Sequence, residues 1–235
     1  MLAWSGSLTK SDNGFVPRKE RTPMATKSAL TQQLGVVAGF DDPRVELEQY
    51  RTPPELAAHL VHTADLQGDI EDCLVIDLGC GTGMLALAAA LRGPETVVGV
   101  DIDAKPLRTA QTNERRVAST TTISWVRADA TRVPLCPDRR SPPCQTTVIM
   151  NPPFGAQDGN EHADRRFLTT CAEIADVSYS IHNADSAAFI EAFADDEGGT
   201  VTHAYAATFD IPRTFSFHET ERKELDVELF RIEWR

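Results

Sequence analysis

Short apolar runs alternate with amphipathic stretches along most of the chain. The apolar runs are rich in Val, Ile and Leu, which predicts buried strands, and the stretches between them carry apolar residues at helical spacing. Strands are expected at 73–79, 96–103, 122–129, 146–153 and 177–182, and helices at 83–93, 104–118, 163–175 and 186–198. Two final apolar segments, 201–211 and 224–234, predict an antiparallel hairpin. The alternation predicts an α/β fold in which helices cover both faces of a mostly parallel sheet.

The N-terminal part departs from this alternation. Residues 1–25 are polar and show no periodicity, so we expect a disordered extension. Residues 26–235 have the length of a single domain, which opens with helices between residues 28 and 67. Thr52 is expected to cap the second of these helices, because two prolines that suit a first helical turn follow it.

The charge balance is strongly acidic. Acidic residues number 35 against 23 basic ones, which gives a net charge of −12, and only five of the bases are lysines. A lysine-poor, acidic surface is typical of proteins dissolved in concentrated salt, so we expect a halophilic, archaeal source. High salt weakens the counterion release that makes basic patches useful for binding nucleic acid. The charge therefore neither supports nor excludes an RNA substrate.

The sequence disfavours two further classes of protein, namely membrane or secreted proteins and proteins built around a metal site or disulfides. No apolar run has the length of a membrane span or the form of a signal peptide, so we expect a soluble, cytoplasmic protein. The five cysteines contain no CxxC pair, so buried thiols are expected instead of a metal site or a disulfide framework.

A glycine-rich turn, Asp77-Leu78-Gly79-Cys80-Gly81-Thr82-Gly83, joins the first strand to its helix. Glycines there let the backbone turn sharply and let a ligand approach main-chain atoms. Asp101 ends the next strand and can accept hydrogen bonds from both ribose hydroxyls of a nucleoside, and Asp129 after the third strand can reach an adenine amine. Since ligands bind at the carboxyl ends of parallel strands, we expect a nucleoside site at this edge.

The spacing of the turn separates two nucleoside cofactors. A nicotinamide dehydrogenase has G-x-G-x-x-G, which seats a pyrophosphate, whereas this turn reads G-x-G-x-G and contains the preceding acid Asp77. That carboxylate would repel a pyrophosphate and attract the ammonium of an amino acid. S-adenosylmethionine (SAM) has such an ammonium and no phosphate, so SAM is the expected cofactor. Glycines that only form a tight turn are the alternative.

A second motif, Asn151-Pro152-Pro153-Phe154, follows the fourth strand and so lies at the same edge. The lone pair of an exocyclic amine such as that of adenine is delocalised into the ring, which makes the nitrogen a poor nucleophile. The side-chain oxygen of Asn151 and the carbonyl of Pro152 can both accept from this amine and favour a pyramidal nitrogen. Proline fixes the carbonyl, and Phe154 offers a face for stacking. The motif predicts methyl transfer to a planar amine; a rigid turn is the alternative.

These motifs resemble those of the class I, SAM-dependent amino-methyltransferases. The segments "LEQYRTPPELAAHL", "VIDLGCGTGMLALAAA", "VIMNPPFGAQ" and "FLTTCAEIADVSYSIH" are similar, in order, to the methyltransferase-like five family, across roughly the span from Gly39 to Ile232. The resemblance implies a Rossmann-like, seven-stranded sheet in the order 3-2-1-4-5-7-6 with an antiparallel last strand. It also implies N6-methylation of one adenosine in small-subunit ribosomal RNA, together with a small Trm112-like activator protein.

The resemblance extends to single residues where the motifs match. The implied cofactor-binding residues are Gln49, Tyr50, Thr52, Asp77, Gly79, Gly81, Asp101, Ile102, Asp129, Ala130 and Asn151. The implied catalytic residues are Asn151, Pro152, Pro153 and Phe154, and Phe154, Phe217 and His218 are candidates for contacts with the target base. The chain departs from the family at Arg51, where a proline is usual, and in the mixed charges of residues 217–223.

The third strand, Thr122–Ala128, would lie at an edge of a sheet in that order, and it is apolar with Trp125 at its centre. An exposed apolar edge favours pairing with another chain, so we expect the activator to add a strand here.

Two other functions are compatible with the motifs. One is methylation of a glutamine in a translation release factor, although Phe154 replaces the tyrosine that is usual there. The other is a non-catalytic scaffold for ribosome assembly, against which the presence of Asp77, Asp101 and Asn151 argues.

Overall fold

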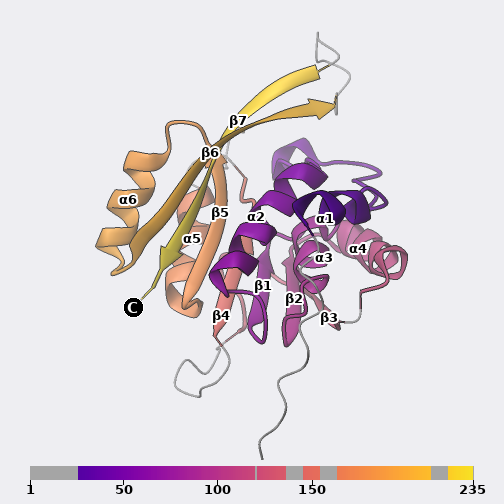
Figure 1. Cartoon of the computed structure of the whole chain (residues 1–235), viewed down its shortest axis with the longest axis horizontal. Coiled ribbons are helices and arrows are strands. Elements are labelled where there is room, and N and C mark those ends of the chain that lie inside the picture. The colour runs from indigo at the N-terminus through magenta and orange to yellow at the C-terminus, as the bar shows by residue number, and fades with distance from the viewer. Residues whose placement is uncertain (1–25, 120, 136–144, 154–162, 213–221, 235) are drawn as a thin grey trace, which may run out of the picture.

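The computed structural model describes residues 26–119, 121–135, 145–153, 163–212 and 222–234, and only the backbone of 209–212 and 222–225 (Figure 1). Each strand and helix expected from the sequence is present. The strands are β1 (Leu74–Leu78), β2 (Thr96–Asp101), β3 (Ile123–Arg127), β4 (Thr146–Met150), β5 (Val177–Asn183), β6 (Thr200–Pro212) and β7 (Arg222–Glu233). The helices are α1 (Lys27–Leu34), η1 (Val45–Leu47, a 3-10 helix), α2 (Pro54–Gln67), α3 (Met84–Ala90), α4 (Ala104–Val117), α5 (Ala163–Ile174) and α6 (Ala187–Asp196).

The strands form one sheet in the order β3-β2-β1-β4-β5-β7-β6, which confirms the predicted order. Strands β1 to β5 are parallel, and β7 runs antiparallel to both of its neighbours, β5 and β6. The strand order reverses at β1, which lies between β2 and β4. A reversal of this kind opens a crevice at the carboxyl ends of the strands on either side of it.

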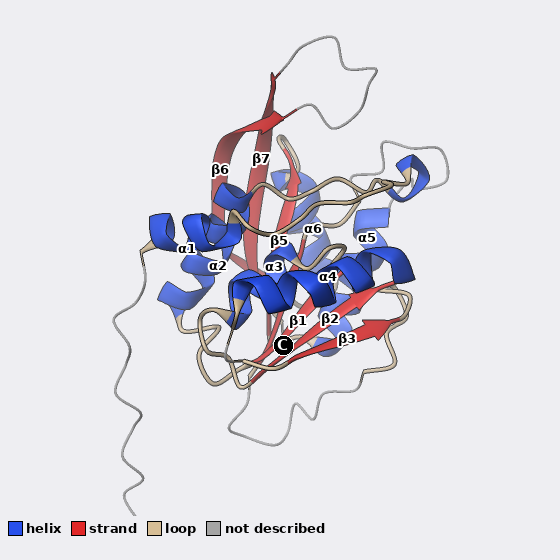
Figure 2. Ribbon diagram, turned by 90° about the vertical axis from the view of Figure 1, so that its right-hand side faces the viewer, coloured by secondary structure: helices blue, strands red, loops and turns tan. Residues whose placement is uncertain are grey.

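Helices α1 to α4 lie on one face of the sheet, and α5 and α6 lie on the other (Figures 1 and 2). Successive strand residues enter opposite cores, so Val75 packs with α1, α2 and α3 whereas Ile76 packs with α5 and α6. Every residue of α3 is buried, because the helix is enclosed by its neighbours and by the sheet. This burial explains why its sequence is apolar throughout.

The start of α2 differs from the prediction. Pro53 takes the N-cap position, and no side chain caps the helix. The Leu56 amide of the first turn donates to the Pro53 carbonyl, and Pro54 has no N–H to be capped. The prediction that Thr52 caps α2 is therefore wrong: its hydroxyl instead accepts a hydrogen bond of 3.0 Å from Nδ2 of Asn151.

The hairpin of β6 and β7 extends past the carboxyl ends of the central strands (Figure 1). Near the other end of the sheet, a buried ion pair joins it to the rest of the chain. Nε of Arg231 on β7 lies 2.8 Å from Oδ2 of Asp69, and the Tyr179 hydroxyl of β5 donates to the same oxygen at 2.6 Å. Since Asp69 precedes β1, these bonds hold the antiparallel strands against the parallel part of the sheet.

β3 is an edge strand, as predicted, but Trp125 does not form an exposed apolar edge. The ring packs so closely on two glycines that an added Cβ would lie 2.7 Å from it at Gly83 and 2.6 Å at Gly99. Its Nε1 donates to Glu114 of α4 at 2.8 Å. Trp125 is therefore partly buried, because α4 packs along this face of β3 (Figure 2).

Among the described cysteines, Cys73, Cys80 and Cys171 are buried free thiols, as expected. Cys136, Cys144 and the predicted disordered extension 1–25 lie outside the described residues. Within the described part of the chain, no helix combines the length and the hydropathy needed to cross a membrane.

Candidate active site

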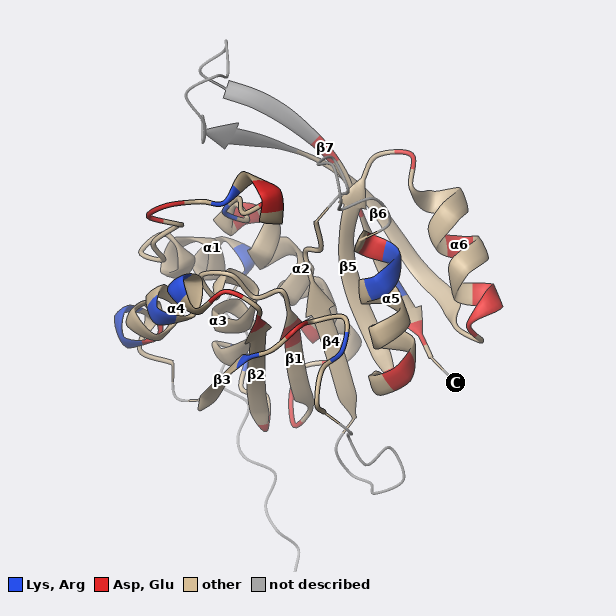
Figure 3. Ribbon diagram, turned by 180° about the vertical axis from the view of Figure 1, so that it is seen from behind, with Lys and Arg blue, Asp and Glu red and all other residues tan. Residues whose placement is uncertain are grey.

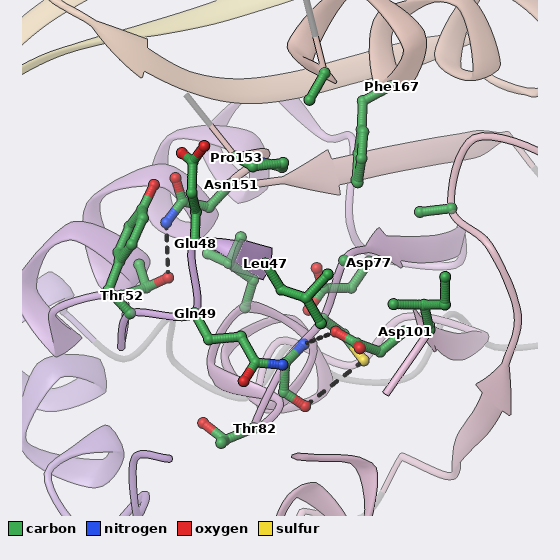
Figure 4. Close-up of a pocket in the computed structure, with 18 of the residues that line it drawn as sticks. Leu47, Glu48, Gln49, Thr52, Asp77, Thr82, Asp101, Asn151, Pro153 and Phe167 are labelled. Carbon is green, nitrogen blue, oxygen red and sulfur yellow. Dashed lines mark hydrogen bonds between the residues drawn. The ribbon is translucent and has the colours of Figure 1, made fainter. Parts of the chain in front are cut away.

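A cavity of about 470 Å³ opens at the carboxyl ends of β1, β2 and β4 (Figure 4). This volume is in the range of small-molecule sites. A strap, residues 40–52, contributes much of its lining, and α5 contributes part of the rest. All of the predicted cofactor residues line it: Gln49, Tyr50, Thr52, Asp77, Gly79, Gly81, Asp101, Ile102, Asp129, Ala130 and Asn151.

The turn requires glycine at two positions, both because the backbone has a positive φ there and because a side chain would collide with neighbouring rings. Gly79 and Gly81 have φ values of 73° and 53°, in the left-handed region. A Cβ on Gly81 would lie 2.8 Å from Cζ of Phe40 in the strap, and one on Gly79 would lie 3.1 Å from the ring of Phe167 in α5. Two aromatic rings from distant segments therefore lie against the turn.

Asp101 holds this turn in place. Its Oδ2 accepts from the Gly81 amide and its Oδ1 from the Asp103 amide, each at 2.8 Å. Burial raises the pKa of Asp101, and these hydrogen bonds oppose the rise. A carboxylate has about four acceptor positions, so both oxygens can still accept from a ligand. The neighbouring Ile102 leaves 53% of its surface exposed, which gives the cavity an apolar surface that a flat ring could cover.

Asp77 is buried at the centre of the site, and its Oδ2 accepts from the Ala86 amide of α3 at 2.8 Å. Burial raises its pKa to about 8; the Ala86 bond opposes this rise, and the charge of Asp101 adds to it. Among the described side chains, no cation forms a salt bridge with Asp77. Because ionising a buried, unpaired carboxyl group is costly, the site favours a ligand that brings a positive charge.

Asn151 directly follows β4 and presents an oxygen without a partner. Its Nδ2 donates to Thr52, and its Oδ1 is buried with no hydrogen-bond partner in the described part of the chain. Figure 4 shows Asn151 and Pro153 at one end of the site and Asp101 towards the other. A buried acceptor left unsatisfied costs about 1–3 kcal/mol, so this oxygen is a position for a donor on a ligand.

Hydrogen bonds hold the strap over the cavity. Gln49 donates from Nε2 to Oδ2 of Asp103 at 3.1 Å, and its Oε1 accepts from the Arg44 amide at 2.9 Å. Lys105 of α4 bonds Asp42 at 3.1 Å. Gln49 therefore lines the site while its polar atoms tie the strap to the turn after β2.

Some predicted residues are not part of this lining. Pro152 is buried beside the cavity without lining it, whereas Pro153 does line it. Phe154, Phe217 and His218 lie outside the described residues.

The sequence analysis missed several lining residues, namely Phe40, Leu47, Glu48, Arg132, Arg166 and Phe167. Phe40 belongs to no quoted segment, and Phe167 opens one to which no site role was assigned, because both reach the glycine turn only after the chain has folded. Arg132 could have been found from its place three residues after Asp129, and Leu47 and Glu48 from their place beside Gln49.

Known proteins share this architecture. A family model described as a methyltransferase domain matches residues 75–148. The chain is 34% identical to the rRNA N(6)-adenosine-methyltransferase Mettl5 of Drosophila melanogaster, over 87% of this chain and 94% of the fly protein. The crystal structure of a proposed RNA methyltransferase from Pyrococcus horikoshii matches with a TM-score of 0.78 at 37% identity, covering 90% of this chain and 98% of that one.

A more distant structure shares the fold alone. The magnesium protoporphyrin IX methyltransferase of Synechocystis PCC 6803, crystallised with bound SAM, matches with a TM-score of 0.58 at 19% identity, covering 76% of this chain and 78% of that one.

Proposed function

The chain belongs to the family of rRNA N6-adenosine-methyltransferases that includes Mettl5, and we propose that it methylates N6 of one adenosine in small-subunit ribosomal RNA. The observation that carries this proposal is the buried Oδ1 of Asn151, which has no hydrogen-bond partner among the described residues and lies in the cavity that Asp77 and Asp101 also line. Methyl transfer to a base amine requires a hydrogen-bond acceptor for the amine next to a site for the methyl donor. Oδ1 of Asn151 can be that acceptor, and Asp77 and Asp101 can bind a cationic nucleoside.

The chemistry of the lining fits SAM, the cofactor of this class of enzyme. Asp77 offers a buried carboxylate to the ammonium group, and Asp101 offers acceptors to the ribose hydroxyls. The exposed Ile102 side chain can cover one face of the adenine, and Asp129 and Ala130 lie where its polar edge would bind. When bound, SAM supplies a methyl group on a cationic sulfur.

The residues after β4 act on the nitrogen that receives the methyl group. Oδ1 of Asn151 would accept from the adenine NH2, and the carbonyl of Pro152, which is buried beside the cavity, is the proposed second acceptor. Both bonds would localise the lone pair on N6. With SAM and the target adenosine bound, SAM would supply its methyl group to N6, and the nitrogen would release one proton to water. We propose that Phe154, Phe217 and His218, which lie outside the described residues, contact the target base, with Phe154 stacking on it.

A small activator protein is the proposed partner, and it would add a strand to β3. Thr122 accepts from the Val97 amide and the Ala128 amide donates to Asp101, so these two residues turn their backbone groups toward β2. Backbone groups alternate in direction along a strand, so those of Ile123, Trp125 and Arg127 face the open edge. An edge with free donors and acceptors is suited to β-augmentation.

A methyl-transfer assay with radiolabelled SAM tests the proposed reaction. Small-subunit ribosomal RNA and a release factor are offered separately to the wild-type protein and to Asn151→Ala. We expect label in the RNA, recovered as N6-methyladenosine, and at least a hundredfold less with Asn151→Ala. Label in the release factor would overturn the RNA assignment, and no label in either substrate would favour a non-catalytic scaffold.

A further inference from the structure

Two arginines from separate elements line the cavity beside Asp129. Arg132 lies in the loop after β3, and Arg166 lies in the first turn of α5. Both act on the carboxyl group of Asp129: partial burial raises its pKa, but hydrogen bonds from Thr131 and the charges of the two arginines bring it below its usual value. Both arginines therefore line the same cavity as Asp129 and lie close enough to act on its charge.

Within the described residues, neither Arg132 nor Arg166 forms a salt bridge. Oδ1 of Asp129 is already engaged by the amide and the hydroxyl of Thr131, at 2.8 and 2.7 Å. Basic residues elsewhere on the chain do pair with acids, as Lys105 does with Asp42. On a protein with a net charge of −12, two exposed cations in the lining of one cavity, neither in a salt bridge with a described residue, indicate an anionic ligand.

The cofactor does not account for these cations. SAM has no phosphate, and its one carboxylate belongs to the amino-acid end that we assign to Asp77 and the glycine turn. The adenine end assigned to Asp129 carries no charge. The substrate does supply anions: each nucleotide of an RNA strand has a phosphate, and the planar guanidinium group binds phosphate oxygens through two parallel hydrogen bonds.

We propose that Arg132 and Arg166 form a phosphate clamp, which holds the RNA backbone next to the target adenosine. This inference rests on the proposed RNA substrate. Figure 3 shows the basic segment of α5 between acidic ones, beside the carboxyl ends of the parallel strands. The clamp attracts the RNA backbone to the mouth of the cavity, whereas the acidic surface around it repels the phosphates. It therefore sets the position of the RNA strand and takes no part in methyl transfer itself.

The test compares the double variant Arg132→Gln/Arg166→Gln with Arg165→Gln. Arg165 is a matched control because it neighbours Arg166 and is also exposed, but its guanidinium lies over the ring of Phe193, 5.4 Å from the centroid, and it does not line the cavity. Binding of a small-subunit rRNA fragment is measured by fluorescence anisotropy over a range of KCl concentrations, and binding of SAM by calorimetry.

The clamp predicts that the double variant binds the RNA about tenfold more weakly, and that the slope of log K against log[salt] becomes less steep by about 1.4, which corresponds to two phosphates of a single strand. Its SAM affinity should stay within twofold of wild type, and Arg165→Gln should change neither quantity. An unchanged salt slope, an equal loss with Arg165→Gln, or a tenfold loss of SAM affinity would each overturn the clamp.

Neutral methylphosphonate linkages beside the target adenosine separate the clamp from a general charge effect. They should weaken RNA binding by the wild-type protein and leave binding by the double variant unchanged; a further loss in the double variant would overturn the clamp. The proposed function fails separately, if the wild-type protein methylates no adenosine in ribosomal RNA.

Discussion

Asn151 can turn either an oxygen or an NH2 group toward the cavity, and only the oxygen can accept from an adenine amine. Thr52 accepts from Nδ2 and so satisfies the end of the carboxamide that points away from the substrate. The family resemblance implies that Thr52 binds the cofactor, and its bond to Asn151 gives it a second role in the site. Thr52 is therefore a positioning residue that acts through Asn151.

Thr52→Val should remove this bond while keeping the shape of the side chain. The loss of one hydrogen bond to the buried amide is worth about 1.4 kcal/mol, so we expect kcat to fall about tenfold. KM for SAM should change little, the melting temperature should fall by a few degrees because the folded protein also loses this bond, and Thr52→Ser should recover most of the activity. Steady-state kinetics decides: a rise in KM for SAM with kcat unchanged would show that Thr52 acts on the cofactor alone.

Asp77 should make cofactor binding depend on pH. With a pKa of about 8 it is mostly protonated at pH 7 in the free protein, whereas the ammonium of SAM pairs with its ionised form. Binding therefore releases a proton, and affinity should rise with pH, up to tenfold per unit between pH 5.5 and 7.5. Calorimetry across this range measures it. Asp77→Asn should bind SAM weakly with little pH dependence, and an equally steep profile in that variant would rule out Asp77 as the source.

Among the elements, the glycine turn depends on a contact that the sequence does not reveal. Gly81 faces Phe40 of the strap, and its amide donates to Asp101, so the turn, the strap and the end of β2 are fixed together. A side chain at this position would disturb all three.

Gly81→Ala should weaken SAM binding at least tenfold and lower stability by about 1–2 kcal/mol, because a positive φ and a contact of 2.8 Å both oppose the added methyl group. Gly93→Ala is the matched control, since Gly93 has a φ of 73° but no atom within 4 Å of an added Cβ. Urea unfolding and SAM titration distinguish them. If both variants lost stability and SAM affinity equally, the positive φ alone would explain why position 81 is a glycine, and the contact with Phe40 would not matter.

The elements themselves were predictable, because apolar runs such as 74–78 and 96–101 carry the pattern of buried strands. Asp77, Asp101, Asp129 and Asn151 were predictable for the same reason, since each lies within two residues of the carboxyl end of such a run. What could not be predicted are contacts between segments far apart in the sequence. The bond from Asn151 to Thr52, the packing of Phe40 on Gly81 and the inward position of Trp125 all arise from tertiary packing.

At the scale of the whole molecule, the two edges of the sheet differ. β6 pairs with β7 in a long hairpin that continues past the sheet, whereas β3 ends the parallel part with backbone groups directed outward. Because the Trp125 side chain packs inward, replacing it would disturb the fold as well as any partner. A variant that tests binding of the activator must therefore change a backbone hydrogen-bonding group of β3 and leave Trp125 in place.

Arg127→Pro removes one outward N–H from β3 without removing a bond to β2, and proline is tolerated on an edge strand. We expect it to lower activator affinity at least tenfold, while Arg127→Ala binds normally. The Ala variant is the control because it also lacks the bond from Nε to the Ile102 carbonyl. Co-purification of the activator with each variant gives the answer, and equal recovery with both would place the partner elsewhere.

The most direct test of the proposed chemistry is a crystal structure of the protein with SAM and an RNA fragment that contains the target adenosine. We predict that Oδ1 of Asn151 lies within hydrogen-bond distance of adenine N6, about 2.7–3.2 Å, with N6 facing the methyl group. An Asn151 oxygen directed away from the base, or an adenosine bound outside the cavity, would contradict the proposed function.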